Sequence, residues 1–237
     1  MSEPTIERRD ELAANLAKVR GRIAAACEQA GRDPEEITVV VVTKFFPASD
    51  VRLLVELGIT DIGENRHQEA EAKAAECHDL DVRWHFVGGL QSNKAAAVAA
   101  YSDVVESVDR AKLVQRLDSG AHGRSHAVDC LIQVSLDEAD AAGRSGAAPT
   151  DVPTLAEAIE SAGMLTLRGL MAVAPLGVDP RGPFERLAEI HAELVAERPS
   201  ASWLSAGMSA DLEEAIEVGA THVRVGTAIL GSRPQVK

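Results

Sequence analysis

A lysine follows a run of β-branched residues near the start of the chain. The stretch ITVVVVTK, from Ile37 to Lys44, predicts a buried strand because β-branched residues favour extended structure. Side chains alternate along a strand, so Lys44 is expected to point inward with Val40 and Val42. An amine at the mouth of an apolar strand loses hydration, which favours its neutral, nucleophilic form. The alternative is a lysine whose amine reaches back to solvent.

A neutral lysine amine can condense with an aldehyde to form a Schiff base, and pyridoxal phosphate is the commonest biological aldehyde held in that way. Two glycine turns late in the chain could hold its phosphate. Ser209 stands two residues after Gly207, and Thr227 directly follows Gly226. Glycine lets the backbone approach a ligand closely, and a hydroxyl can donate to a phosphate oxygen. The alternative is that both turns are ordinary helix starts.

Arg224 lies inside the apolar stretch VRVG, so its side chain is expected to point into the barrel mouth while Val223 and Val225 point away. A guanidinium there needs an acceptor, and the pyridine nitrogen of the cofactor would supply one if it stays unprotonated. The cofactor would then be a weak electron sink. The alternative is a structural ion pair with an acidic residue on a neighbouring strand.

Two further polar residues have two interpretations each. His85 stands between Trp84 and Phe86, so it either contacts a ligand or is a core histidine. Asn65 either orients the lysine or the ring oxygen, or begins a helix. The carboxylates form no close pair for acid and base chemistry, and the histidines are not spaced for a metal, so we expect no metal site.

Strands alternating with helices must position these residues. Helices are expected between the strands, and another precedes them over Ile6–Ala30. Eight such units, in a chain near the usual ~250 residues, predict a single (β/α)8 TIM barrel with an extra N-terminal helix. The expected strands are Ile37–Lys44, Ile59–Ile62, Val82–Val87, Val104–Val108, Ala127–Val134, Leu167–Val173, Trp203–Ala206 and His222–Val225.

Sites in such barrels lie at the carboxyl ends of the strands, and phosphate is commonly held after strands seven and eight. Lys44 and the two glycine turns fall at those places. Ser209 is expected either to cap a helix over Ser209–Val218 or to contact the phosphate. The stretch Glu138–Pro153 fits neither helix nor strand, so we expect a loop there. No domain boundary is visible, and residues 1–237 are expected to form one domain.

The composition points away from several classes of function. The 237 residues carry a formal charge of −13, which opposes binding to nucleic acid or to anionic lipid. Cys27, Cys77 and Cys130 form no CxxC pair, as expected for reduced thiols. The N-terminus lacks the apolar segment of a signal peptide, and no apolar run approaches ~20 residues. We therefore expect a cytoplasmic protein that neither enters nor binds a membrane.

Several motifs, in order along nearly the whole chain, resemble those of the pyridoxal phosphate homeostasis proteins. The matching motifs are VVTK around Lys44, IGENRHQEAEAK from Ile62, WHFVGGLQSNK from Trp84, SVDR from Ser107, LIQVS from Leu131, LRGLMAV from Leu167, LSAGMSADLEEAI from Leu204 and VRVGTAILG from Val223. Two of them depart from the family, because GGLQSNK replaces the more usual GPLQSNK and LSAGMS replaces LSMGMS.

The resemblance implies a barrel similar to the N-terminal domain of alanine racemases, with pyridoxal 5'-phosphate joined to Lys44. It places the ring-nitrogen arginine on Arg224 and the motif asparagine on Asn65. The phosphate-binding motifs of the family fall on Ser205, Gly207, Met208, Ser209, Gly226 and Thr227.

Two classes of function remain after this comparison. One is a carrier that holds the cofactor and passes it to apo-enzymes, and the other is a racemase or related enzyme acting on small amino acids. Racemisation needs two bases on opposite faces of the substrate carbon. Lys44 can be one, whereas Tyr101, the single tyrosine, is expected at the opposite end of the barrel. We therefore expect cofactor binding without substantial turnover, no catalytic residue and a monomer.

Overall fold

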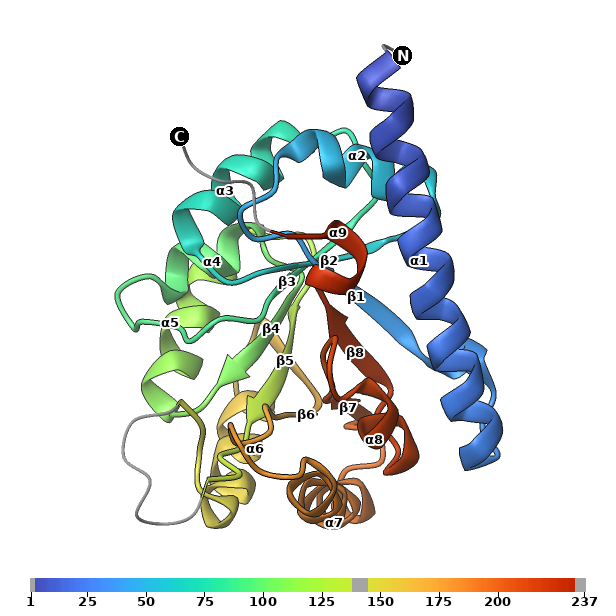
Figure 1. Ribbon diagram of the computed structural model, residues 1–237. Helices are drawn as coiled ribbons and strands as arrows, with labels where there is room; N and C mark the ends of the chain where they lie inside the picture. Colours follow the sequence, from blue (N-terminus) through green and yellow to red (C-terminus); the bar gives the residue numbers. More distant parts are fainter. Residues whose placement is uncertain (1–2, 138–144, 233–237) are drawn as a thin grey trace.

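The computed structural model describes residues 3–137 and 145–232. In this part of the chain, eight parallel strands pair in sequence order and β8 closes on β1 (Figure 1). The prediction of a (β/α)8 TIM barrel is confirmed. The strands are β1 (Thr38–Val42), β2 (Asp61–Glu64), β3 (Arg83–Phe86), β4 (Val104–Val108), β5 (Val128–Gln133), β6 (Leu165–Met171), β7 (Trp203–Ser205) and β8 (His222–Val225).

Helices surround the barrel, and α1 (Glu3–Ala30) is the extra N-terminal helix that the sequence predicts (Figure 1). The others are α2 (Ala48–Glu56), α3 (His67–Glu76), α4 (Ala95–Tyr101), α5 (Ala111–Ala121), α6 (Val152–Glu160), α7 (Arg181–Glu197), α8 (Leu212–Glu217), α9 (Thr227–Leu230) and the short 3-10 helices η1 (Pro34–Glu36) and η2 (Pro149–Asp151). None of the helices in the described ranges is both long and apolar enough to span a membrane.

The strand β1 separates two environments because its side chains alternate. Val41 belongs to the apolar cluster between the barrel and its helices, together with Leu16 of α1. Val40 and Val42 both lie against Gly63 of β2. The barrel interior therefore receives Val40 and Val42, as the alternation in the sequence predicts.

The bounds of β1 and β2 differ from the sequence prediction. The strand β1 ends at Val42, so Lys44 lies in the following turn and not in the strand. The prediction of a strand over Ile59–Ile62 is also wrong, since β2 runs from Asp61 to Glu64. Pairing with β3 sets those limits, from Asp61 opposite Arg83 to Glu64 opposite Phe86. Local residue preference contains no information on such pairing.

The predicted loop over Glu138–Pro153 is wrong at its carboxyl end. Residues 138–144 lie outside the described part of the chain. Pro149–Asp151 form η2, and α6 begins at Val152. Proline near the start of each segment fits a helix start, because its fixed backbone angle suits the first helical turn.

The pairing of β5 with β6 contains a β-bulge. Cys130 pairs with Leu167 while Leu131 pairs with Gly169, so Arg168 is the extra residue on β6. Gly169 has φ +152°, and a Cβ atom there would lie 1.8 Å from the carbonyl oxygen of Trp203. Glycine is therefore required at this position by both conformation and space.

We expect Gly169→Ala to lower the free energy of unfolding by about 3 kcal/mol or more, because backbone atoms of β7 cannot move aside easily. Gly182→Ala in α7 is the matched control, since nothing lies within 4 Å of a Cβ atom there. The control is expected to be neutral or to stabilise by up to about 1 kcal/mol. Urea unfolding of the two variants measures both effects, and equal stabilities would contradict the assignment of the bulge.

Candidate functional site

A cavity of about 400 Å³ opens where the strands of the barrel end. Its wall comes from the loops that follow β1, β2, β3, β6, β7 and β8. Most of the predicted binding residues line it, namely Lys44, Asn65, Met208, Ser209, Arg224, Gly226 and Thr227. Apolar residues such as Val42, Phe46 and Val87 complete the wall. The cavity therefore combines a few polar groups with an apolar surface, as small-molecule sites commonly do.

The turn that carries Lys44 has an unusual backbone. Phe45 has φ +71°, a left-handed conformation that is unfavourable for a bulky residue. Its amide N–H donates to Glu69 Oε1 at 2.5 Å, and the guanidinium of Arg66 lies 4.6 Å from its ring. The amide of Phe46 closes the turn on the carbonyl of Thr43 at 3.0 Å. These contacts hold half-buried Lys44 in the cavity wall.

A buried ion pair lies behind this turn, and the sequence analysis did not identify it. Lys73 of α3 contacts Glu64 of β2, and its Nζ also donates to the carbonyl of Thr43 at 2.9 Å. The hydroxyl of Thr43 donates to Glu64 Oε1 at 2.6 Å. Burial raises the pKa of Glu64, with Lys73 and Thr43 opposing that effect. The sequence contains one hint of this group, because Glu69 and Lys73 are spaced so that both lie on one face of a helix.

Arg224 has the protein contacts of a buried structural residue, and its contact with a cofactor ring stays a prediction. It lines the cavity, and its guanidinium is buried at 4% exposure. One nitrogen donates to Ser205 Oγ at 2.6 Å and another to the carbonyl of Ala172 at 2.7 Å. Glu106 Oε2 lies 3.7 Å from the first nitrogen. Its acidic partner comes from β4, across the barrel, and not from a neighbouring strand.

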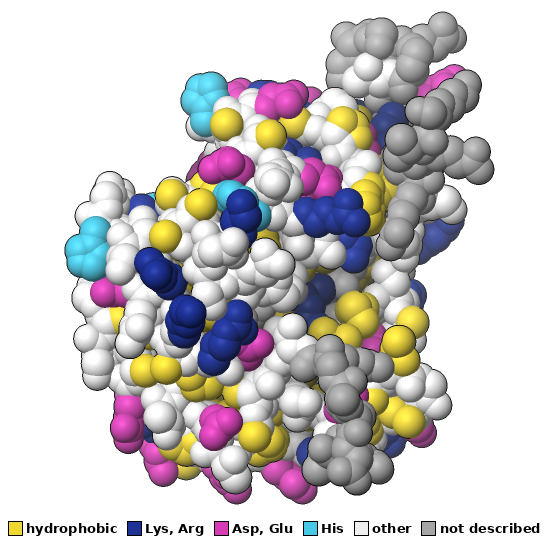
Figure 2. All heavy atoms as spheres, turned by 90° about the vertical axis from the view of Figure 1, so that its left-hand side faces the viewer, with side chains coloured by type: hydrophobic (Ala, Val, Ile, Leu, Met, Phe, Trp, Pro, Cys, Tyr) yellow, Lys and Arg dark blue, Asp and Glu magenta, His cyan; other side chains and the backbone are white. Residues whose placement is uncertain are grey.

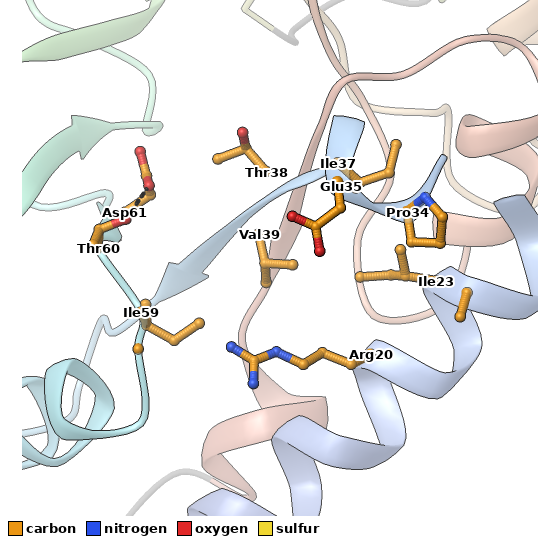
Figure 3. A pocket seen from close by; sticks show the side chains of 12 residues that line it. Arg20, Ile23, Pro34, Glu35, Ile37, Thr38, Val39, Ile59, Thr60 and Asp61 are labelled. Carbon is orange, nitrogen blue, oxygen red and sulfur yellow. Dashed lines mark hydrogen bonds between the residues drawn. The ribbon is translucent and has the colours of Figure 1, made fainter. Parts of the chain in front are cut away.

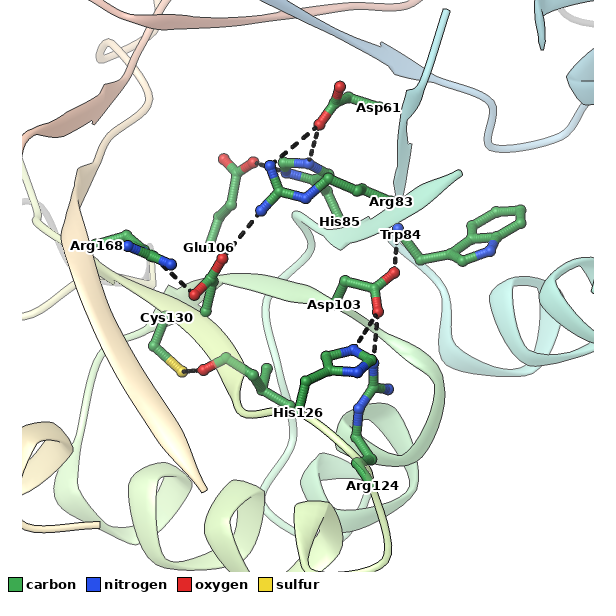
Figure 4. A network of polar contacts seen from close by, with 12 residues as sticks. Asp61, Arg83, Trp84, His85, Asp103, Glu106, Arg124, His126, Cys130 and Arg168 are labelled. Atoms are coloured by element: carbon green, nitrogen blue, oxygen red, sulfur yellow. Dashed lines mark hydrogen bonds and ion pairs between the residues drawn. The ribbon is translucent and has the colours of Figure 1, made fainter. Parts of the chain in front are cut away.

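The structure places His85 and Ser205 beneath the cavity wall. His85 is buried in the barrel interior, where Nδ1 lies 2.8 Å from Glu106 and Nε2 lies 2.9 Å from Asp61 (Figure 4). Burial by itself lowers the pKa of His85, but the two carboxylates outweigh burial and raise it. A role for His85 in direct cofactor contact stays a prediction, whereas its contacts are those of a core ion pair.

The turn at Gly207 packs closely on the following helix, whose start differs from the prediction. Gly207 has φ +87°, and a Cβ atom there would lie 2.7 Å from the Cβ of Ala215, so the turn packs closely on α8. The prediction that Ser209 begins a helix is wrong, because α8 starts at Leu212 and Asp211 is its N-cap. Asp211 Oδ1 accepts the amide of Met208 at 2.6 Å, a bond that closes the turn before α8 and does not cap the helix.

The second turn and the first meet at the cavity. Gly226 is the N-cap of α9, which begins at Thr227. Ser209 Oγ lies 3.5 Å from the hydroxyl of Thr227 and 3.4 Å from the amide of Ala228. The two predicted phosphate turns therefore form one polar corner of the cavity.

Three basic residues follow strands at the end of the barrel where the cavity opens, although the chain carries −13 in total. The loops after β2, β3 and β4 carry Arg66, Lys94 and Arg110. Figure 2 shows Lys and Arg side chains grouped on the face that looks left in Figure 1. Such a group attracts anions locally, whatever the net charge. In the described ranges, no cluster of three His, Cys, Asp or Glu residues could hold a metal.

A second cavity of about 610 Å³ lies at the other end of the barrel, between α1 and the starts of β1 and β2 (Figure 3). Arg20, Thr38 and Asp61 are among its lining residues. The predicted binding residues instead gather at the carboxyl end. The smaller cavity is therefore the candidate site.

Comparisons with known proteins agree with this geometry. The family model described as alanine racemase, N-terminal domain, matches residues 9–234. The chain is 42% identical to the pyridoxal phosphate homeostasis protein of Mycobacterium tuberculosis, over 96% of this chain and 95% of that protein. It is 38% identical to the protein of that name from Escherichia coli K12, over 96% and 99% of the two chains. The chain belongs to the pyridoxal phosphate homeostasis protein family.

Solved structures extend the comparison for this pyridoxal phosphate homeostasis family member. PipY of Synechococcus elongatus, in a structure with PLP bound, is 34% identical with a TM-score of 0.78, over 93% of this chain and 100% of that one. An alanine racemase of Clostridium difficile is 14% identical with a TM-score of 0.71, over 95% of this chain and 58% of that one. The racemase likeness shows a shared fold alone.

Lys73→Met should lower the free energy of unfolding of this family member by about 3–5 kcal/mol, because Glu64 would lose the cation that offsets the cost of its burial. Lys112→Met, at an exposed position of α5, is the matched control and should have little effect. The double variant Lys73→Met with Glu64→Leu should recover much of the loss. Urea unfolding measures all three, and a double variant no more stable than Lys73→Met would contradict a buried ion pair.

Proposed function

We propose that this chain binds pyridoxal 5'-phosphate through a Schiff base with Lys44 and takes part in intracellular vitamin B6 homeostasis by buffering and delivering the cofactor. One observation carries the proposal, namely a single cavity lined by the amine of Lys44, the guanidinium of Arg224 and two glycine turns. The curated relatives named pyridoxal phosphate homeostasis protein and the PipY structure with PLP bound support it.

The polar groups of the cavity fit the groups of the cofactor. Asn65 Oδ1 is buried without a hydrogen-bond partner in the described part of the chain. A buried acceptor needs a donor, and the phenolic hydroxyl of the cofactor is one. Arg224 donates and never accepts, so it suits an unprotonated ring nitrogen. Ser209, Thr227 and the first amides of α9 suit the phosphate, because those amides have no partner inside the helix.

Lys44 would hold the cofactor, which when bound supplies an aldehyde carbon that primary amines attack. Val42, Phe46 and Val87 line the cavity together with Lys44 and make part of its wall apolar. An apolar environment favours the neutral form of an amine, which is the nucleophile. The turn at Phe45 holds the lysine in place through contacts of the protein itself.

The position of Tyr101 favours a carrier over a racemase. Tyr101 stacks on His67 of α3, with ring centroids 6.0 Å apart, on the outer side of the barrel. Burial raises the pKa of its phenol, so the group keeps its proton at neutral pH. A protonated phenol held away from the cavity is a poor second base. An accessible cavity, in contrast, lets an amine of another molecule reach the cofactor.

We further propose that the chain acts as a monomer in the cytoplasm and that apo-enzymes which need pyridoxal phosphate receive the cofactor from it. Cys27, Cys77 and Cys130 are buried free thiols, which suits a reducing compartment. The formal charge of −13 disfavours nucleic acid and anionic membranes as partners.

The linkage is tested by borohydride reduction of the protein loaded with pyridoxal phosphate. We expect a visible absorption that disappears on reduction and a stable mass increase on the peptide containing Lys44. Lys44→Ala should abolish both the absorption and the label, while Lys94→Ala should retain them. A label on Lys94 or Lys73 instead would show that the site is wrongly assigned.

Turnover is tested by incubating the loaded protein with L-alanine, D-alanine or L-serine and following chirality. We expect no steady racemisation at rates near ~1 per second or above, which is the ordinary enzymatic range. An authentic alanine racemase assayed in parallel is the positive control. Steady racemisation at such rates that Lys44→Ala removes would replace the carrier with the enzyme.

A further inference from the structure

A continuous chain of buried polar contacts runs from the cavity into the barrel. Arg224 donates to Ser205 Oγ at 2.6 Å, and Ser205 Oγ donates to Glu106 Oε2 at 2.6 Å. The other oxygen of Glu106 lies 2.8 Å from His85 Nδ1, and His85 Nε2 lies 2.9 Å from Asp61 (Figure 4). These residues come from five different strands or strand ends, so only the closed barrel unites them.

The chemistry of Arg224 at one end and of the carboxylates at the other determines the direction of each hydrogen bond in this series of contacts. Arg224 can only donate, so Ser205 must accept from it. The single hydroxyl proton of Ser205 then goes to Glu106, which accepts as a carboxylate. His85 faces a carboxylate at each nitrogen, which requires both nitrogens to carry protons. The charges therefore alternate along the chain, with a guanidinium, a carboxylate, an imidazolium and a carboxylate.

The surrounding charged groups are consistent with this alternation. Burial by itself would raise the pKa of Glu106, but His85, Arg224 and Ser205 outweigh burial and hold it at about 2. The nearby His222 is neutral, since burial lowers its pKa to about 4. Arg83 approaches the far end of the chain, 3.8 Å from Asp61. Glu106 is thus ionised, and it is the carboxylate that faces Arg224.

We propose that Glu106 is a positioning residue for the cofactor, because through Ser205 it determines which edge of Arg224 faces the cavity. Glu106 itself lies in the barrel interior at 0% exposure and acts through its neighbour. Two nitrogens of Arg224 are committed to Ser205 and to the carbonyl of Ala172. Those bonds leave the remaining N–H groups for a ring nitrogen in the cavity. The inference rests on the proposed function and deepens it.

Loss of the carboxylate should disturb this arrangement in a specific way. A glutamine at position 106 has one oxygen and one NH2 group, so it cannot accept from His85 and Ser205 together. It also removes the negative charge 3.7 Å from the guanidinium of Arg224. The guanidinium would keep its bond to the carbonyl of Ala172, but the hydroxyl of Ser205 that orients its other nitrogen would lose its fixed acceptor. We expect the cofactor to bind about tenfold or more weakly, and its visible absorption maximum to shift.

Glu106→Gln and Ser205→Ala test the proposal, with Asp129→Asn as the matched control. Asp129 pairs with Arg83 and Arg168 near the start of β5, so the control makes the same kind of acid-to-amide change without removing a partner of Arg224. Pyridoxal phosphate affinity, the absorption maximum and thermal unfolding are measured for each. The first two variants should share the weaker binding and the shifted maximum, and the control should keep the wild-type affinity and maximum.

A second measurement needs no cofactor. In the cofactor-free protein, NMR signals of the Arg224 guanidinium, assigned with Arg224→Lys, should show slow solvent exchange that becomes fast in Ser205→Ala and Glu106→Gln. If Glu106→Gln fails to fold, Ser205→Ala alone provides both readouts. Folded variants with wild-type affinity, absorption maximum and exchange would overturn the inference. Absence of borohydride label on Lys44 in the wild type would instead overturn the proposed function, while the exchange result would still test the hydrogen-bond chain.

Discussion

Charge taken out of water inside a closed barrel needs opposite charge and hydrogen bonds close by. Arg224 meets this condition through Ser205 and Glu106, and His85 and Asp61 continue the compensation across the interior. The cavity depends on this constraint because Arg224 is at once a member of the buried network and part of the cavity wall. A neutral residue in the place of Glu106 would remove the carboxylate that lies between the charges of Arg224 and His85.

A second set of buried, paired charges lies on the outer side of β1 and β2. Lys73 and Glu64 form it between the barrel and α3, and it reaches the turn of Lys44 through the carbonyl and hydroxyl of Thr43. Alternation along the strand explains the arrangement, since Thr43 and Val41 face the helices while Val42 faces the interior. One network therefore holds the lysine turn from outside the barrel, and the other holds the arginine from within. Contacts within the protein therefore hold the turn of Lys44 and the side chain of Arg224 in place. Such preorganisation limits the conformational entropy that is lost when a ligand binds.

The barrel is shared with alanine racemases, but a fold can serve many functions, and the site must decide between them. In this chain, the residues around the cavity suit the holding of a small phosphorylated aromatic aldehyde. Tyr101 lies away from the cavity, where its ring stacks on His67 and α4 meets α3. The proposed lysine and the two proposed phosphate turns lie together at the cavity in the described part of the chain.

Local pattern in the sequence determined the alternation of strands and helices, the inward direction of Arg224, and the positions of the two glycine turns, because each depends on residues a few positions apart. The tertiary structure decided where β1 and β2 end, that α8 begins at Leu212 and not at Ser209, and that His85 lies in a buried ion pair. It also decided the partners of Glu64, Lys73 and Glu106. Those features depend on pairing between strands and on contacts across the barrel. Barrel closure brings such residues together from distant parts of the chain, and spacing along the sequence does not specify which of them meet.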